Sequence, residues 1–518
     1  MKTIPALLLG ATAALAQQYT NPVLWEDLAD SDVIRVEDAY YYSASTMHYS
    51  PGAPVLRSYN LVDWEYVSHS VPVLDFGTAY SLDDDQRAYV QGIWASTLRY
   101  QPSSSTFRWL GCIDFSTTYV YSASNIEGPW EQTASIPNCY YDAGLLIDDS
   151  NGTEGVYVAY GSTSIRVAEL SSDLTTELTT QVVYEAPDDV GYIEGARFYY
   201  INGNHYIWVT RPATDQLILK STNGPLGPYE LREVVVNVAS PVQGSGAPHQ
   251  GAIVDTPSGD WWYIAFVDAY PGGRIPVLAP VTWDADGWPS IVLDDAGGWG
   301  ANYDYPVVSD KSVTPIPTSY TFLQDTLSAE WEWNHNPDNE QWSISQRGGL
   351  VLRTASVTDD LYQAKNTLTR RIHGPNVTAT LRLDVSGMVD GDVSGLALFR
   401  DKTAWIGLRK LNGSVRVSMT SGVDMANDWT TVSTGSEGQG VQLTGTEVYL
   451  QVTVDITPGA GTGSFAYSLD GSSFDPLGPE YALNNVWEFF LGYRFGIFNY
   501  ATLGLGGQVS VLGFEISD

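Results

Sequence analysis

The sequence predicts an all-β protein: a five-bladed β-propeller followed by a jelly-roll β-sandwich. Two patterns carry this prediction. Five aromatic-rich segments recur through about the first 300 residues, and segments of alternating apolar and polar residues fill the rest. No stretch has a convincing helical period. We therefore divide the chain into a propeller over residues 17–306, a linker over 307–319 and a sandwich over 320–518.

The propeller prediction depends on the spacing of the aromatic segments, each of which reads as one strand of a blade. These segments are residues 39–43, 107–111, 156–160, 205–209 and 261–265. Turn sequences such as 60–64, 125–130 and 284–288 follow most of them, at intervals of roughly 50 to 65 residues that suit one four-stranded blade each. The first strand of every blade lines the central channel. The residues ahead of the aromatic segments should therefore converge there, and they are Asp30, Trp94, Asp142, Glu194 and His249.

The linker and the sandwich follow from a change of pattern. Pro306, Pro315 and Pro317 interrupt the periodicity. Beyond them, strands with a period of two and a closing strand near the C-terminus predict a concanavalin-like sandwich. These strands are expected at 377–383, 395–399, 405–408, 415–419, 448–454, 465–469 and 509–515. The tryptophans Trp331, Trp333 and Trp342 predict an apolar seam that holds the sandwich against the propeller, beside the mouth of the active site.

The N-terminus has the features of a secretory signal peptide. Lys2 precedes an apolar run over residues 4–15, and residues 14–16 form a small-residue cleavage site. A secreted, extracellular protein is expected, with a mature chain beginning near Gln17. Three glycosylation sequons, at Asn151, Asn376 and Asn412, agree with this. No other apolar run is long enough for a membrane helix, so no membrane association is expected.

Composition narrows the kind of partner. The formal net charge of −35 disfavours nucleic acid and acidic lipids and favours neutral substrates. The 33 tyrosines and 17 tryptophans offer faces that suit sugar rings, although propeller cores also use many aromatic rings. The only cysteines, Cys112 and Cys139, are expected to form a disulfide; a metal site would need further ligands. We expect a monomer.

Three carboxyl groups in one channel suit glycoside hydrolysis. This reaction needs one carboxylic acid to protonate the leaving oxygen and a second carboxylate on the other side of the sugar. Asp30, Asp142 and Glu194 can fill both roles. The third group can raise the pKa of the acid by like-charge repulsion.

The motifs around these residues resemble glycoside hydrolase family 43. They are residues 21–23, 29–36 and 40–46, then 92–95, 142–149, 193–196, 251–257 and 273–281, and beyond the linker 331–334 and 384–398. The resemblance implies an inverting hydrolase in which Asp30 is the general base, Glu194 the general acid and Asp142 the group that orients the acid and adjusts its pKa. It implies that no cofactor is required and no catalytic metal is bound, although a structural calcium ion would be compatible with it.

Two departures from the family pattern affect these assignments. The usual Asp-Pro-Ser at the base reads Asp30-Ser31-Asp32, and on a strand Asp32 would share the face of Asp30, which makes Asp32 an alternative base. The usual Asp-Pro-Ser at the third carboxylate reads Asp142-Ala143-Gly144, which loosens the backbone there.

Four further residues are candidates for substrate binding. Arg274 can pair with a carboxylate and donate to sugar hydroxyls. Trp94 and Tyr49 can stack on the sugar or pack within a blade. His249 can be a hydrogen-bonded core histidine, a ligand for water or a metal ion, or a substrate contact.

The resemblance favours a fungal two-domain α-L-arabinofuranosidase that acts on arabinoxylan or arabinose-substituted xylo-oligosaccharides, with a preference for the 1,3-linked arabinose of doubly substituted xylose. A β-xylosidase, or a bifunctional xylosidase and arabinofuranosidase, is the alternative. From another class, a carbohydrate-binding protein without catalysis is a remote third possibility. The three carboxylates in register argue against it.

Overall fold

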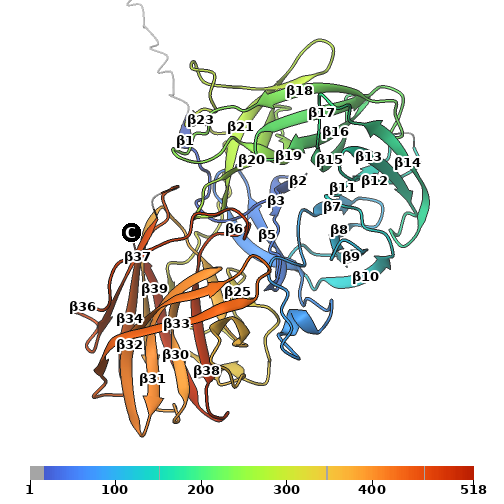
Figure 1. Cartoon of the computed structure of the whole chain (residues 1–518). Helices are drawn as coiled ribbons and strands as arrows, with labels where there is room; N and C mark the ends of the chain where they lie inside the picture. Colours follow the sequence, from blue (N-terminus) through green and yellow to red (C-terminus); the bar gives the residue numbers. More distant parts are fainter. Residues whose placement is uncertain (1–16, 151, 346–347, 460, 518) are drawn as a thin grey trace, which may run out of the picture.

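The computed structural model describes residues 17–517 except 151, 346–347 and 460, and it confirms the predicted all-β architecture (Figure 1). The expected signal peptide and the sequon at Asn151 lie outside the described residues. The described helical segments are two short 3₁₀ turns, η1 (Thr78–Ser81) and η2 (Leu361–Gln363). Across the described part of the chain, no helix is long and apolar enough to cross a membrane.

Five four-stranded antiparallel sheets form the propeller. Their strands are β2 (Asp32–Val36), β3 (Ala39–Ser43), β5 (Gly52–Ser58) and β6 (Glu65–Val71); β7 (Thr97–Gln101), β8 (Thr106–Ile113), β9 (Thr117–Ala123) and β10 (Glu131–Ile136); β11 (Gly144–Asp148), β12 (Gly155–Tyr160), β13 (Ser164–Leu170) and β14 (Glu177–Glu185); β15 (Glu194–Ile201), β16 (Asn204–Arg211), β17 (Asp215–Ser221) and β18 (Glu230–Val236); and β19 (His249–Asp255), β20 (Trp261–Asp268), β21 (Arg274–Trp283) and β22 (Pro289–Ile291). A separate pair, β1 (Gln18–Thr20) and β23 (Asn302–Asp304), joins the two ends of this part.

Each aromatic segment of the sequence is the second strand of its blade, namely β3, β8, β12, β16 and β20. Their rings pack between neighbouring blades; fully buried Trp109 and Trp208 are examples. The first strands β2, β7, β11, β15 and β19 contact one another around the channel. Residues that begin or precede these inner strands are therefore brought to one end of the channel.

Two large sheets form the sandwich. One runs in the order β26 (Trp342–Ile344), β27 (Leu350–Arg353), β39 (Gln508–Ser517), β29 (Asn376–Asp384), β34 (Glu447–Asp455), β35 (Thr462–Ser468) and β36 (Asp475–Pro476), with β24 (Ser319–Tyr320) on β39 and β37 (Tyr481–Ala482) on β35. The other runs β33 (Thr431–Gln442), β32 (Ser414–Met425), β31 (Lys402–Leu411), β30 (Asp392–Phe399), β38 (Arg494–Ala501), β28 (Leu368–Arg371), β25 (Trp331–Asn334) and β4 (Tyr49–Ser50). Because β4 belongs to the propeller part of the chain, backbone hydrogen bonds join the domains.

The predicted apolar seam exists, but other residues build it. Trp331 packs inside the sandwich, with its ring 5.1 Å from that of Tyr320 and 5.3 Å from that of Phe514. An apolar cluster that does cross the junction includes Met47 and Tyr89 of the propeller with Phe489 of the sandwich. The tryptophans therefore stabilise the sandwich itself, and the apolar contact between the domains includes other residues, among them Met47, Tyr89 and Phe489.

Buried ion pairs add to this junction. Glu26 of the propeller pairs with Arg370 of the sandwich at 3.0 Å, and Glu332 of the sandwich accepts from Arg371 at 2.8 Å and contacts His69 of the propeller at 3.1 Å. Burial opposes ionisation of Glu26, but Arg370 and His373 lower its pKa to about 2. Buried pairs of this kind contribute little net stability and cost about 3 to 5 kcal/mol when one partner is lost. The pairs that cross the junction, Glu26 with Arg370 and His69 with Glu332, link the propeller to the sandwich at fixed points.

Candidate active site

A cavity of about 410 Å³ opens at the end of the channel where the inner strands begin. All three predicted carboxylates line it: Asp30 ahead of β2, Asp142 ahead of β11 and Glu194 at the start of β15. Trp94 and Arg274 also line it. The structure therefore brings five of the seven predicted site residues together from five different blades.

Asp30 and Asp142 both have left-handed backbone conformations, with φ of 59° and 50°. Such values are uncommon for residues other than glycine, and they persist where the surrounding structure enforces them. Each aspartate sits in the turn that leads into an inner strand. The positive φ lets the chain turn at this point while both side chains line the cavity.

Asp30 is buried and forms an ion pair with Arg274. Its Oδ1 accepts from Nη1 of Arg274 at 3.1 Å, while Nε of Arg274 donates to the carbonyl of Phe490 at 3.1 Å. Among the described residues, no hydrogen bond reaches Oδ2 of Asp30. A buried oxygen of this kind is a ready acceptor for a water molecule or a substrate hydroxyl.

Glu194 is half-buried and is held by two tyrosines. The hydroxyl groups of Tyr141 and Tyr192 donate to Oε2 of Glu194 at 2.6 and 3.0 Å. Burial raises the pKa of Tyr141 far above its ordinary value, and Asp142 and Glu194 add to the effect, so this hydroxyl stays protonated and donates. The sequence prediction missed both tyrosines, although Tyr141 adjoins Asp142 and Tyr192 lies two residues before Glu194.

Asp142 lies beside the Glu194 strand, where its Oδ2 accepts the backbone N–H of Gly195 at 3.2 Å. Burial raises the pKa of Asp142 well above its usual range, Glu194 and Asp30 add like-charge repulsion, and Arg197 opposes the shift. Asp142 therefore retains a proton under conditions in which an isolated aspartate would lose it.

Aromatic rings surround the mouth, and two of them come from the sandwich. Phe490 meets Trp94 edge to face at 4.9 Å, and Trp487 packs against Phe490 at 5.3 Å. Phe115 and Tyr192 of the propeller complete the rim. Phe115, Tyr192 and Trp487 are 67%, 49% and 57% exposed, which leaves faces available for sugar rings. The sandwich therefore borders the active-site mouth, as predicted, although its two residues were not identified.

Two predicted substrate-binding residues are not brought to the cavity. Tyr49 lies in β4 at the junction between the domains, where it is fully buried and its ring lies 3.5 Å from the Arg494 guanidinium carbon. His249 is buried against Phe266, with its Nδ1 2.9 Å from the carbonyl of Ala247. Gln250, the next residue, lines the cavity instead. These positions correct the expectation that Tyr49 stacks on the sugar, and they favour the core-histidine alternative for His249.

Asp32, the alternative base, points away from the cavity. It is fully buried, and its carboxylate accepts from the Leu98 backbone N–H at 2.9 Å and from Nη1 of Arg99 at 2.8 Å. A carboxylate engaged in this way has a structural role. Asp30 is therefore the stronger candidate for the base.

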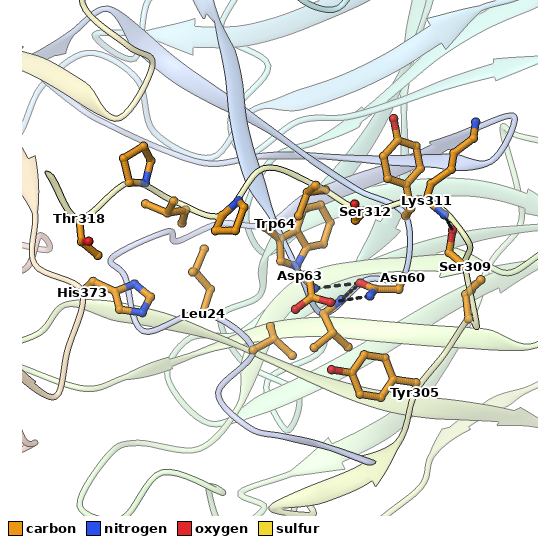
Figure 2. A pocket seen from close by; sticks show the side chains of 18 of the residues that line it. Leu24, Asn60, Asp63, Trp64, Tyr305, Ser309, Lys311, Ser312, Thr318 and His373 are labelled. Atoms are coloured by element: carbon orange, nitrogen blue, oxygen red, sulfur yellow. Dashed lines mark hydrogen bonds between the residues drawn. The ribbon is translucent and has the colours of Figure 1, made fainter. Parts of the chain in front are cut away.

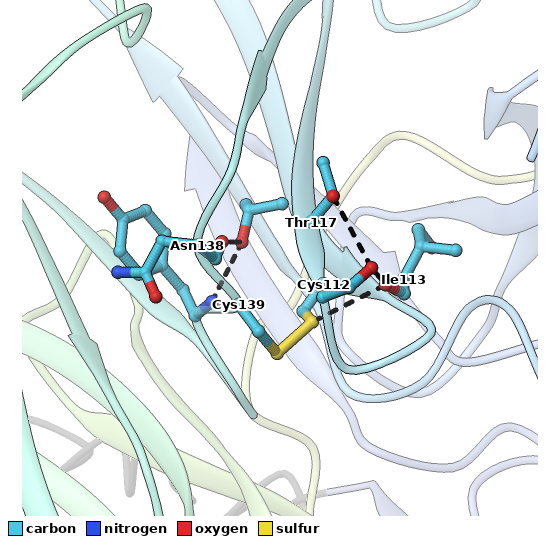
Figure 3. Close-up of a disulfide and its surroundings, with 8 residues drawn as sticks. Cys112, Ile113, Thr117, Asn138 and Cys139 are labelled. Carbon is cyan, nitrogen blue, oxygen red and sulfur yellow. Dashed lines mark hydrogen bonds between the residues drawn. A yellow bond between two sulfur atoms is a disulfide. The ribbon is translucent and has the colours of Figure 1, made fainter.

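The predicted disulfide between Cys112 and Cys139 is present, with a Cα–Cα distance of 5.1 Å (Figure 3). Cys112 lines the cavity, and Cys139 lies two residues before Tyr141 and three before Asp142. Closing this loop of 27 residues stabilises the fold by about 3.5 kcal/mol, largely by constraining the unfolded chain. It also ties the hairpin that carries Phe115 to the segment that carries Tyr141, and these two rings stack at 6.0 Å.

A larger cavity of about 780 Å³ lies beneath the linker, between a turn of the first blade and the sandwich (Figure 2). Among its described lining residues the one carboxyl group is Asp63, which accepts from Asn60 at 2.7 Å. It therefore has no pair of acids. Within the described ranges, no group of three or more His, Cys, Asp or Glu residues is placed to hold a metal ion.

Comparison with known proteins gives a family match for each of the two domains. The model of Glycosyl hydrolases family 43 matches residues 19–289, and that of the β-xylosidase C-terminal concanavalin A-like domain matches residues 319–514. A β-xylosidase of Formosa agariphila is 28% identical, covering 95% of this chain and 89% of that protein. A non-reducing end α-L-arabinofuranosidase of Bacteroides ovatus is 27% identical, covering 76% of this chain and 75% of that protein.

A solved family 43 glycoside hydrolase, whose active site was engineered to display both endo-xylanase and exo-arabinofuranosidase activity, is 46% identical with a TM-score of 0.93. The match covers 97% of this chain and 100% of that one. Both domains are thus matched, and the chain belongs to glycoside hydrolase family 43.

Proposed function

We propose that the protein is a secreted, inverting α-L-arabinofuranosidase that removes arabinose from arabinoxylan, with a preference for the 1,3-linked arabinose of doubly substituted xylose. The observation that carries the activity is the 46% identity, over both domains, to a hydrolase whose engineered form displays exo-arabinofuranosidase activity. The cavity of about 410 Å³ is of a size that suits a terminal sugar. The exposed rings of Phe115, Tyr192 and Trp487 at its mouth are suited to the xylan chain.

In the mechanism that we propose, Asp30 is the general base. Arg274 holds its Oδ1, which leaves Oδ2, without a hydrogen bond from the described residues, to accept from the water that attacks the anomeric carbon. As the water attacks, its proton passes to Asp30. Inverting enzymes place the two carboxyl groups about 6.5 to 9.5 Å apart to make room for this water.

Glu194 is the general acid of this mechanism. Tyr141 and Tyr192 both donate to Oε2, which leaves Oε1 to carry the transferred proton to the glycosidic oxygen. Asp142 positions the acid through the Gly195 N–H, and its raised pKa favours its protonated form beside Glu194. This chemistry needs carboxyl groups and water, and no cofactor.

A β-xylosidase is the second candidate, supported by the relative of that name that matches 95% of the chain. A carbohydrate-binding protein without catalysis is disfavoured because the three carboxylates line one cavity with the contacts that acid and base chemistry needs.

Incubation with arabinoxylan, linear arabinan and xylobiose separates these functions. We expect arabinose from arabinoxylan and little product from the other two substrates. Oligosaccharides with singly and doubly substituted xylose, compared at equal concentration, test the preference, and only the doubly substituted ones should lose their 1,3-linked arabinose rapidly. Xylose release from xylobiose at a comparable rate would replace the proposal with a xylosidase, and binding without product would favour the third class.

A further inference from the structure

A fully buried arginine, Arg197, lies beneath the three carboxylates and outside the cavity lining. It belongs to β15, three residues after Glu194, where the pairing of β15 with β16 is irregular. Its guanidinium donates four hydrogen bonds to backbone carbonyl groups. We propose that Arg197 is a positioning residue that sets the spacing of the acid and the base; this inference rests on the proposed function.

The partners of Arg197 carry the argument. Nη2 donates to the carbonyl of Asp30 at 2.7 Å and Nε to that of Ser31 at 3.2 Å. Nη1 donates to the carbonyls of Ala143 and Ala196, each at 3.1 Å. One planar group thus joins the turn of Asp30, the residue after Asp142 and the strand of Glu194, which belong to three different blades.

These hydrogen bonds hold segments of the backbone that have uncommon conformations. Asp30 and Asp142 have positive φ values, and Arg197 holds the carbonyl of the first and that of the residue after the second. The guanidinium is a rigid fork with five donors, so it can fix several carbonyls at once, whereas a lysine ammonium is a compact charge on a flexible stem. Displacement of a reacting group by about 1 Å can lower the rate by about 10²-fold.

The positive charge of Arg197 makes a second contribution to catalysis, and this contribution can be tested apart from the positioning of the backbone. The groups that act on Asp142 are Glu194 of β15, Asp30 ahead of β2, the adjacent Tyr141 and Arg197 itself. Arg197 is the cation among them and favours the ionised form. Loss of its charge should therefore favour the protonated form of Asp142 and move the alkaline limb of the rate profile to higher pH.

Arg197→Lys and Arg197→Met separate the two contributions when kcat, KM and the pH profile are measured on the full chain. For Arg197→Lys, we expect kcat to fall by about 10²-fold with KM changed less than about threefold and the alkaline limb in place. For Arg197→Met, we expect kcat to fall by at least the same factor, and we expect the alkaline limb of the pH profile to move to higher pH. If Arg197→Met does not fold, the lysine variant alone decides the outcome.

Arg99→Met is the matched control. Arg99 is also largely buried and pairs with Asp32, which lies 3.9 Å from Nε of Arg197. Within the described part of the chain, no hydrogen bond of Arg99 reaches the backbone of Asp30 or Asp142. This variant should lose thermal stability and keep kcat per folded molecule. A folded Arg197→Lys with kcat within threefold of wild type would overturn the proposal, as would an equal loss of kcat in Arg99→Met.

Aryl arabinofuranoside and aryl xyloside, assayed in parallel, keep this test apart from the proposed function. If the wild type hydrolyses the xyloside instead, the proposed specificity fails, and the variants are still compared on the sugar that is cleaved. A wild type inactive on both sugars, on arabinoxylan and on xylobiose would overturn both proposals.

Discussion

Replacement of Glu194 by glutamine is expected to lower kcat on arabinoxylan by about 10²- to 10⁴-fold, the usual contribution of general acid catalysis. Glutamine keeps the size of the side chain and can still accept from Tyr141 and Tyr192, but it has no proton to give to the leaving oxygen. A xylan hydroxyl is a poor leaving group, so this loss should be large on the polymer. Initial rates measured at the optimum pH of the wild type provide the test.

An activated aryl arabinofuranoside is the internal control for this variant. Its leaving group departs without protonation, so the loss for Glu194→Gln should be much smaller on this substrate than on the polymer. Losses of equal size on both substrates would mean that Glu194 does not act as the acid.

Replacement of Asp30 by asparagine is expected to lower kcat by about 10²- to 10⁴-fold on both the polymer and the aryl arabinofuranoside, because the water must be deprotonated whatever group leaves. Asparagine is nearly isosteric and can still accept a hydrogen bond from Arg274. The substitution therefore removes the basic carboxylate of residue 30 and keeps the shape of the side chain. Initial rates on the two substrates, with folding checked by thermal unfolding, are the measurement.

Asp32→Asn is the matched variant, two residues along the same segment. It leaves Arg99 buried beside a neutral partner, so it should destabilise the fold by about 3 to 5 kcal/mol. Most of the activity per folded molecule should remain, because Asp32 does not line the cavity. A more active Asp30→Asn than Asp32→Asn would reverse the assignment of the base.

The fold could be predicted because its signals are local and repeated. Aromatic second strands recur once per blade, and strands with a period of two fill the sandwich. A residue ahead of an inner strand is expected to reach the channel. This reasoning placed Asp30, Trp94, Asp142 and Glu194 at one cavity, where the structure has them, but it also placed His249 there, whereas the next residue, Gln250, lines the cavity.

The contacts between the domains could not be predicted in the same way. Trp487 and Phe490 reach the cavity only because the sandwich docks on the propeller, and nothing in their local sequence indicates this. Tyr49 illustrates the opposite error, because an aromatic residue in a loop looks the same in sequence whether it faces a sugar or another domain. Arg197 shares this difficulty, since its hydrogen-bond partners are carbonyl groups that any residue supplies.

The stereochemistry of hydrolysis tests the assignment of Asp30 and Glu194 as base and acid most directly. Proton NMR spectra recorded in the first minutes of a digest of an α-linked arabinofuranosyl substrate show which anomer of arabinose forms before mutarotation. An inverting pair with room for a water molecule between the two carboxyl groups predicts that β-arabinose appears first. First appearance of α-arabinose would mean retention through a covalent intermediate and would contradict these roles.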